Sequence, residues 1–63
     1  MEGIYTHNKT GNFYHIVDEA KLKDGDQWVD CIIYVSKYTG KNDVYVRRKD
    51  DFEKKFTKVT KTS

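Results

Sequence analysis

Short stretches in which hydrophobic and polar residues alternate recur along the whole chain, and turn-forming residues separate them. Alternation with a period of two is typical of half-buried β-strands. The intervening stretches contain glycine or asparagine, which tolerate the positive φ angles of tight hairpin turns. The pattern predicts strands over residues 3–7, 13–17 with a weaker continuation to 22, 27–38, 44–48 and 57–60.

The stretch 27–38 carries the strongest strand signal. Its centre, residues 31–35, is almost continuously apolar, which favours a central strand covered on both faces. Trp28 is expected to plug the core or to cover an edge of the sheet. The period-two rule divides the strand into one face with Val29, Cys31, Ile33 and Val35 and a second face with Trp28, Asp30, Ile32, Tyr34 and Ser36.

The strand over residues 44–48 also alternates. Because valine is the more hydrophobic residue type, we expect Val44 and Val46 to point inward and Tyr45 and Arg47 to point outward. Both of the chain's arginines, Arg47 and Arg48, stand at the end of this strand.

A short helical segment is predicted directly after this strand. Asp50 followed three residues later by Glu53 matches a capping box, which favours one helical turn. Phe52 and Phe56 are four residues apart, so they would lie on one side of that turn and close the end of the core.

Together these elements predict an all-β fold, either a small five-stranded antiparallel SH3-like barrel or a bent sheet, with one short helical turn before the last strand. The 63 residues suffice for one domain. We expect a folded core over 3–60 and a frayed tail over 61–63.

Composition and charge bear on where the protein works. A single cysteine, Cys31, permits no internal disulfide and fits a reducing cytosol. The first residues do not resemble a signal peptide, and no apolar run approaches the roughly 20 residues that span a membrane. We therefore expect a cytoplasmic protein without membrane contact. Residues 1–46 hold five Lys against seven Asp and Glu, whereas residues 47–63 hold seven Lys and Arg against three acids, so the basic end suits a phosphate or an acidic partner.

Enzyme and metal signatures are absent from the sequence. There is no nucleophile elbow, no H-E-x-x-H and no G-x-G-x-x-G, and the pair Gly40-Lys41 lacks the upstream glycine of a P-loop. His7, His15 and Cys31 do not have the spacing of zinc ligands. We expect a protein that is not an enzyme and that uses no cofactor or metal, with Cys31 an inert thiol in the core.

Several segments in order resemble a known family. They are Gly3-x-Tyr5-x-His7-x-Lys9, Tyr14-x-Ile16-Val17-x-x-Ala20, Ile32-Ile33-Tyr34-x-x-x-Tyr38, and Val44-Tyr45-Val46-Arg47 followed by Phe52 and Phe56. Over residues 3–59 this order and spacing resemble the domain of unknown function 1653 family of small bacterial and phage proteins. The resemblance implies a compact β-rich domain, often in a phage or prophage setting, and it implies no activity.

The chain departs from that family at two positions. Arg48 stands where the family usually has proline, and Asp51 stands where it usually has an apolar residue. The turn after the fourth strand is therefore expected to be looser and more basic than is typical of the family.

A combination of aromatic and basic residues is the remaining functional signal. Tyrosine rings suit stacking on a base, and a guanidinium suits a phosphate. The expected ligand-binding residues are Tyr5, His7, Tyr34, Tyr38, Tyr45, Arg47 and Arg48. Trp28 is expected to have no part in binding.

These residues favour a non-enzymatic module that holds a nucleotide-type or other phosphate-bearing ligand, or a short nucleic acid. In a phage setting such a module would sequester a host signalling nucleotide. An alternative is an adaptor or inhibitor that binds a host protein through the same aromatic face. A purely structural alternative makes the tyrosines part of the barrel wall, with Arg47 over a ring. A homo-oligomer is expected, because a chain this small needs a second copy to enclose a ligand.

Overall fold

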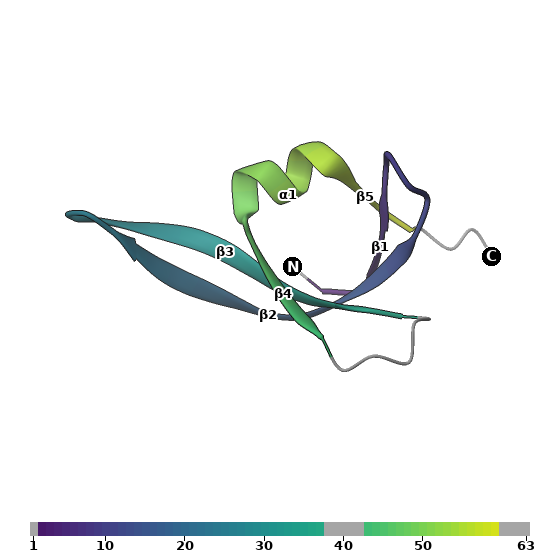
Figure 1. Ribbon diagram of the computed structural model, residues 1–63, viewed down its shortest axis with the longest axis horizontal. Coiled ribbons are helices and arrows are strands. Elements are labelled where there is room, and N and C mark those ends of the chain that lie inside the picture. Colours follow the sequence, from purple (N-terminus) through teal and green to yellow (C-terminus); the bar gives the residue numbers. More distant parts are fainter. Residues whose placement is uncertain (1, 38–42, 60–63) are drawn as a thin grey trace.

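One curled antiparallel sheet of five strands makes up most of the protein (Figure 1). The computed structural model describes residues 2–37 and 43–59. The elements are β1 (Ile4–His7), β2 (Phe13–Asp24), β3 (Gln27–Ser36), β4 (Val44–Arg48), α1 (Lys49–Lys55) and β5 (Phe56–Lys58). The strand order across the sheet is β4-β3-β2-β1-β5, so β4 and β5 form its two edges. Helix α1 lies across the opening between these edges (Figure 1).

The predicted fold class is confirmed. The structure has five antiparallel strands and one short helix before the last strand, and the sheet is bent but not closed into a barrel. All five strands start and end within about two residues of their predicted bounds, and the weak continuation of the second strand is real and reaches Asp24. The third strand ends at Ser36, two residues before its expected end at Tyr38. Tyr38 itself, the turn over 39–42 and the tail over 61–63 lie outside the described residues.

The β2–β3 hairpin extends beyond the rest of the sheet as a two-stranded arm (Figure 1). Its turn follows the last pair, Asp24 with Gln27, and Gly25 has a φ of 62°. Among the described residues every positive φ belongs to a glycine, and Gly25 supplies it in this turn, as Gly11 does between β1 and β2 with a φ of 77°. The register shifts between Ile16 and Asp18, and a bulge of this kind bends the strand that carries it.

The core lies on the face of the sheet that α1 covers, which we call the inner face; the opposite face is the outer face. Six residues form this core: Tyr5, Ile16, Ile32, Tyr34, Phe52 and Phe56. Phe52 is fully buried, and its ring stacks on Phe56 with centroids 4.1 Å apart. A helix of seven residues is too short to be stable alone, so the burial of Phe52 is what holds α1 on the sheet.

The predicted capping box is wrong. The helix begins at Lys49, directly after β4, and its N-cap residue Arg48 makes no side-chain capping hydrogen bond with any described residue. Asp50 lies inside the first turn, where its Oδ1 accepts a hydrogen bond from the Asp51 backbone N–H at 2.8 Å. Because no loop separates β4 from α1, the aspartate has no N-cap position to occupy. Its charge still suits the positive end of the helix dipole.

The predicted orientation of β4 is also wrong. Val44 and Val46 are 60 % and 62 % exposed, whereas the Arg47 side chain is only 30 % exposed. The register pairs Tyr45 with the buried Tyr34 of β3, and opposite residues of an antiparallel pair share a face. Tyr45 and Arg47 therefore lie on the inner face and the two valines on the outer face.

Strand β3 lies inside the sheet between β4 and β2, as expected of a central strand, whereas the expectation for Trp28 needs correction. Trp28 neither plugs the core nor covers an edge, because it lies on the arm and is 63 % exposed, with the Lys23 Nζ 5.2 Å from its ring centroid. Cys31 is buried as expected, at 2 % exposure.

Candidate ligand-binding site

A row of tyrosines crosses the inner face from β1 to β4. Tyr5 pairs in register with Tyr14, and the Tyr14 ring meets the Tyr34 ring edge-on with centroids 5.4 Å apart. The Tyr34 and Tyr45 rings stack at 5.5 Å. We call these four residues the tyrosine row. It forms because alternate residues of four adjacent strands point to the same face.

An aromatic pocket opens where the tyrosine row meets the end of α1. It has a volume of about 200 Å³ and is lined by His7, Tyr14, Tyr34, Tyr45, Arg47 and Phe56. The His7 ring packs on Phe56 with centroids 4.8 Å apart, which forms the wall on the β1 side. The pocket therefore offers several ring faces and edges to a flat ligand, together with one cation.

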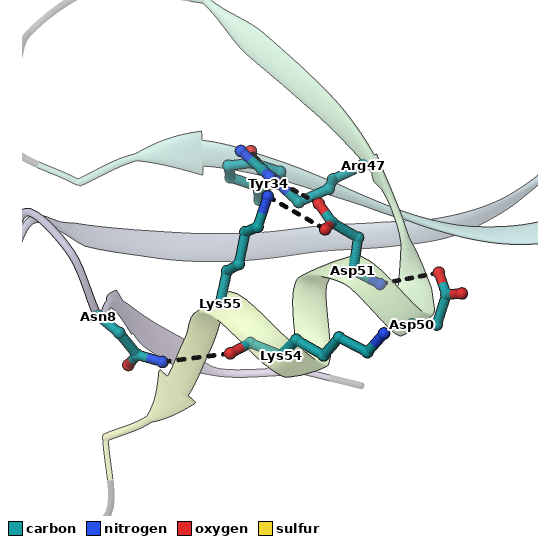
Figure 2. Close-up of polar contacts among 7 residues, drawn as sticks. All are labelled: Asn8, Tyr34, Arg47, Asp50, Asp51, Lys54 and Lys55. Atoms are coloured by element: carbon teal, nitrogen blue, oxygen red, sulfur yellow. Dashed lines mark hydrogen bonds and ion pairs between the residues drawn. The ribbon is translucent and has the colours of Figure 1, made fainter.

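Arg47 is held in place by contacts from the sheet and the helix (Figure 2). Its Nε donates a hydrogen bond to the Tyr34 hydroxyl at 3.2 Å, and its Nη1 donates to Asp51 at 2.6 Å. Its guanidinium carbon lies 5.4 Å from the Phe56 ring centroid, in a cation–π contact. The second oxygen of Asp51 forms an ion pair with Lys55 at 3.2 Å. The guanidinium is thus fixed over the pocket before any ligand arrives.

These contacts also determine the charges at the site. The hydrogen bonds to Tyr34 and to Asp51 raise the pKa of Arg47 above its usual range. The hydrogen bond from Arg47 holds the pKa of Asp51 below its usual range. Both groups are therefore charged at neutral pH. A guanidinium has five N–H donors, and the two bonds described above use two of them.

A second pocket adjoins the first and is basic. It has a volume of about 420 Å³ and is lined by His7, Asn8, Lys9, Lys54 and Lys55, so that His7 belongs to both pockets. Among these described lining residues none is acidic. The Asn8 backbone N–H donates to the Lys55 carbonyl at 2.9 Å, and the Asn8 side chain donates to the Lys54 carbonyl at 3.5 Å (Figure 2). These bonds fix the turn that carries Lys9 against the end of α1.

Four of the seven predicted ligand-binding residues line the aromatic pocket: His7, Tyr34, Tyr45 and Arg47. Tyr5 is instead part of the core, where its ring meets Phe52 edge-on at 5.2 Å. Arg48 lies on the outer face and forms an ion pair with Asp24 across the sheet. Tyr38 lies outside the described residues.

The sequence interpretation missed six residues that line the two pockets: Asn8, Lys9, Tyr14, Lys54, Lys55 and Phe56. Tyr14 had a usable signal, because it shares the strand parity of Ile16, which is apolar and buried. Phe56 was expected in the core. It belongs to the core and also lines the aromatic pocket. Lys54 and Lys55 belong to the basic end of the chain that the charge distribution singled out, whereas Lys9 had no sequence signal. Lys9 joins them only when the turn after β1 contacts the end of α1.

Comparison of the chain with protein-family models, curated proteins and solved structures finds no match. The resemblance to the domain of unknown function 1653 family therefore stays a prediction. Within residues 2–37 and 43–59, no group of three or more His, Cys, Asp or Glu side chains is placed to hold a metal ion. In the same part of the chain, no helix has the length and apolar character to cross a membrane.

Proposed function

We propose that the protein is a non-enzymatic binding module for a nucleotide-type ligand, with the base in the aromatic pocket and the phosphate in the basic pocket. The observation that carries this proposal is the junction of the two pockets at His7. One flat, ring-lined site and one cationic site lie side by side, which is the division of chemistry within a nucleotide.

The base fits the aromatic pocket by size and by chemistry. Ligand pockets usually have volumes of roughly 300–1,000 Å³, and this pocket of about 200 Å³ suits one ring system rather than a whole nucleotide. Tyr34 is only 5 % exposed, whereas Tyr45 is 40 % exposed, so Tyr45 presents the accessible ring face. Stacking of a base on an aromatic side chain contributes about 1–3 kcal/mol.

The phosphate fits the basic pocket better than it fits Arg47 alone. A phosphate that approached Arg47 would meet the carboxylate of Asp51, which already binds the guanidinium. Lys9, Lys54 and Lys55 line the basic pocket, and lysine binds phosphate as a point charge. In this arrangement Arg47 orients the rings of the pocket and offers its remaining N–H donors to the ligand. The lysines supply most of the electrostatic attraction for the phosphate.

Holding a ligand is the whole activity in this proposal. In the phage setting that the family resemblance implies, the protein would act by sequestering a host signalling nucleotide. This role is supported by the lining of the two pockets, because the rings can stack on a base and the cations can bind a phosphate.

Isothermal titration calorimetry with a panel of nucleoside mono-, di- and triphosphates and cyclic nucleotides tests the proposal. Tyr45→Leu removes the accessible ring, and the expected effect is a roughly 5- to 150-fold weaker affinity, from the loss of one stacking contact. The double variant Lys9→Ala/Lys54→Ala is expected to weaken binding and to reduce its dependence on salt. The absence of binding by every nucleotide at about 1 mM would refute the proposal.

The matched control for the lysine variant is Lys23→Ala, since Lys23 lies on the arm against Trp28 and away from both pockets. Its affinity should equal that of the wild type. Arg47→Ala is expected to abolish binding, because it removes the fixed guanidinium and its remaining N–H donors from the aromatic pocket. Arg47 also bonds to Tyr34 and Asp51, so the substitution could unfold the chain. A loss of ligand binding by this variant therefore supports the proposal only if circular dichroism shows that the variant is folded.

A second candidate function is that of an adaptor or inhibitor that binds a protein through the same aromatic face. The exposure of Tyr45 favours it, since tyrosine and arginine are enriched among the residues that dominate protein interfaces. Salt separates the two functions. Phosphate binding weakens steeply as salt rises, whereas an interface made of aromatic contacts changes little.

A further inference from the structure

Strand β4 is an open edge of the sheet. Among the described residues its only strand neighbour is β3, and its five-residue register with β3 contains no bulge. The chain has no proline, so proline does not block this edge. An edge strand without such protection presents unpaired backbone N–H and C=O groups that favour pairing with another strand.

We propose that two copies of this chain associate through β4, antiparallel and about a two-fold axis, so that the two sheets join into one. In the proposed register Tyr45 lies opposite the Tyr45 of the second copy. Val44 then lies opposite the second copy's Val46, and Asp43 lies opposite its Arg47.

Strand parity restricts the register. Residues opposite each other in an antiparallel pair point to the same face, so the inner-face Tyr45 cannot stand opposite an outer-face valine. Two registers remain that pair most of β4 with its copy, and they are centred on Tyr45 or on Val46. Centring on Val46 would place Val44 against Arg48, whose guanidinium is already bound to Asp24. Centring on Tyr45 pairs both valines of each strand with a valine, whereas centring on Val46 does so only for Val46. The register centred on Tyr45 is therefore favoured.

Charge complementarity supports the same register. Asp43 is an exposed acid directly before β4, and Arg47 near the end of the strand keeps N–H donors that its bonds to Tyr34 and Asp51 do not use. An antiparallel partner reverses the order, so each acid faces a guanidinium of the other copy. The β5 edge of the second copy is a poorer partner for β4. It carries Lys58 and follows Lys54 and Lys55, so these lysines would come close to the arginines of β4.

The side chains of β4 are also better satisfied in the pair. The tyrosine row ends at the sheet edge with Tyr45, which is 40 % exposed, and the second copy's Tyr45 would continue it. On the outer face Val44 and Val46 are 60 % and 62 % exposed and would contact their counterparts. The proposal rests on this edge alone and does not depend on any ligand for the two pockets.

Analytical ultracentrifugation of the whole chain, from about 10 µM to about 1 mM, tests for the dimer. The wild type should shift from the mass of one chain toward that of two. Val44→Lys places two charges at the junction and should raise the dissociation constant by at least about tenfold. Val17→Lys is the matched control, since Val17 is 58 % exposed but lies on β2, and it should dimerise like the wild type.

A chain that stays monomeric up to about 1 mM overturns the proposal. An equal loss of dimer in both lysine variants also overturns it, because the cause would then not be the β4 edge. Circular dichroism of each variant shows whether the monomer is folded. Val44 is largely solvent-exposed in the monomer, so both variants should keep the wild-type spectrum.

Disulfide cross-linking tests the register, in a Cys31→Ser background that removes the native thiol. A mixture of the Val44→Cys and Val46→Cys chains should form a disulfide dimer under mild oxidation, and each chain alone should form much less. More cross-linking of Val46→Cys alone than of the mixture overturns the register, because those residues would then lie opposite each other. A dimer in the centrifuge without any cross-link in the three samples overturns β4 as the interface.

Discussion

Removal of the Phe52 ring should release α1 from the sheet. Phe52 is fully buried, stacks on Phe56 at 4.1 Å and contacts Tyr34 at a centroid distance of 5.3 Å. In Phe52→Ala these contacts are lost. The seven-residue helix has no other buried residue, and it is too short to persist without one.

The expected cost is large compared with the stability of the whole chain. Replacing a buried phenylalanine by alanine costs about 3–5 kcal/mol, the sum of lost transfer free energy and of the cavity left behind. A domain gains only about 0.05–0.15 kcal/mol of stability per residue, which gives roughly 3–9 kcal/mol for this chain of 63 residues. Phe52→Ala should therefore lose at least about a third of the unfolding free energy, and its Tm should fall by roughly 12–40 °C.

Urea and thermal unfolding followed by circular dichroism measure this loss. Phe52→Leu should show a smaller decrease and keeps the comparison possible if the alanine variant does not fold. Val17→Ala, at a position 58 % exposed, is the control and should change the unfolding free energy by no more than about 0.5 kcal/mol. A loss below about 1 kcal/mol in Phe52→Ala would refute the conclusion that Phe52 anchors the helix.

Two further predictions concern the Asp51 carboxylate and the hairpin turn. The pKa of Asp51 is lowered from its ordinary value of 3.8, mainly by the hydrogen bond from Arg47, so its contribution to stability is complete above about pH 4 and is lost as the pH falls through the lower pKa of the folded state. The urea midpoint of the wild type should therefore fall more between pH 7 and about pH 3 than that of Asp51→Asn, and an equal fall in both would contradict the role of this pair. Gly25→Ala should cost about 1–2 kcal/mol, because the φ of 62° is unfavourable for a residue with a Cβ and no described atom lies within 4 Å of that Cβ to add a clash. Gly25→Asn should cost less in the same urea experiment, since asparagine tolerates positive φ, and a fully stable alanine variant would contradict the argument.

The alternation of residue types was enough to locate most of the strands, since strand formation depends on local backbone preference and on a period that the sequence displays. It also predicted a short helix directly after β4, although the helix has seven residues rather than a single turn and the capping box that suggested it does not form. Local sequence likewise specified the β2–β3 turn, because Gly25 supplies a conformation that few other residues adopt.

The sequence did not determine which face of β4 points inward. A period of two separates Val44 from Tyr45 but does not say which side is covered. Hydrophobicity alone favoured the valines, whereas the buried partner Tyr34 and the salt bridge to Asp51 draw Tyr45 and Arg47 to the inner face. That choice follows from strand register and from the place where α1 docks, which are properties of the folded chain.

The candidate site shows the same division. Local sequence placed His7, Tyr45 and Arg47 among the candidate binding residues, because rings and a guanidinium suit a base and a phosphate. Only the tertiary structure brought Lys9 beside Lys54, since the turn after β1 and the end of α1 are far apart in the sequence and meet through hydrogen bonds to the backbone. The sequence thus determines which side chains can contact a base or a phosphate. Long-range packing determines which of these side chains lie close enough together to form a site.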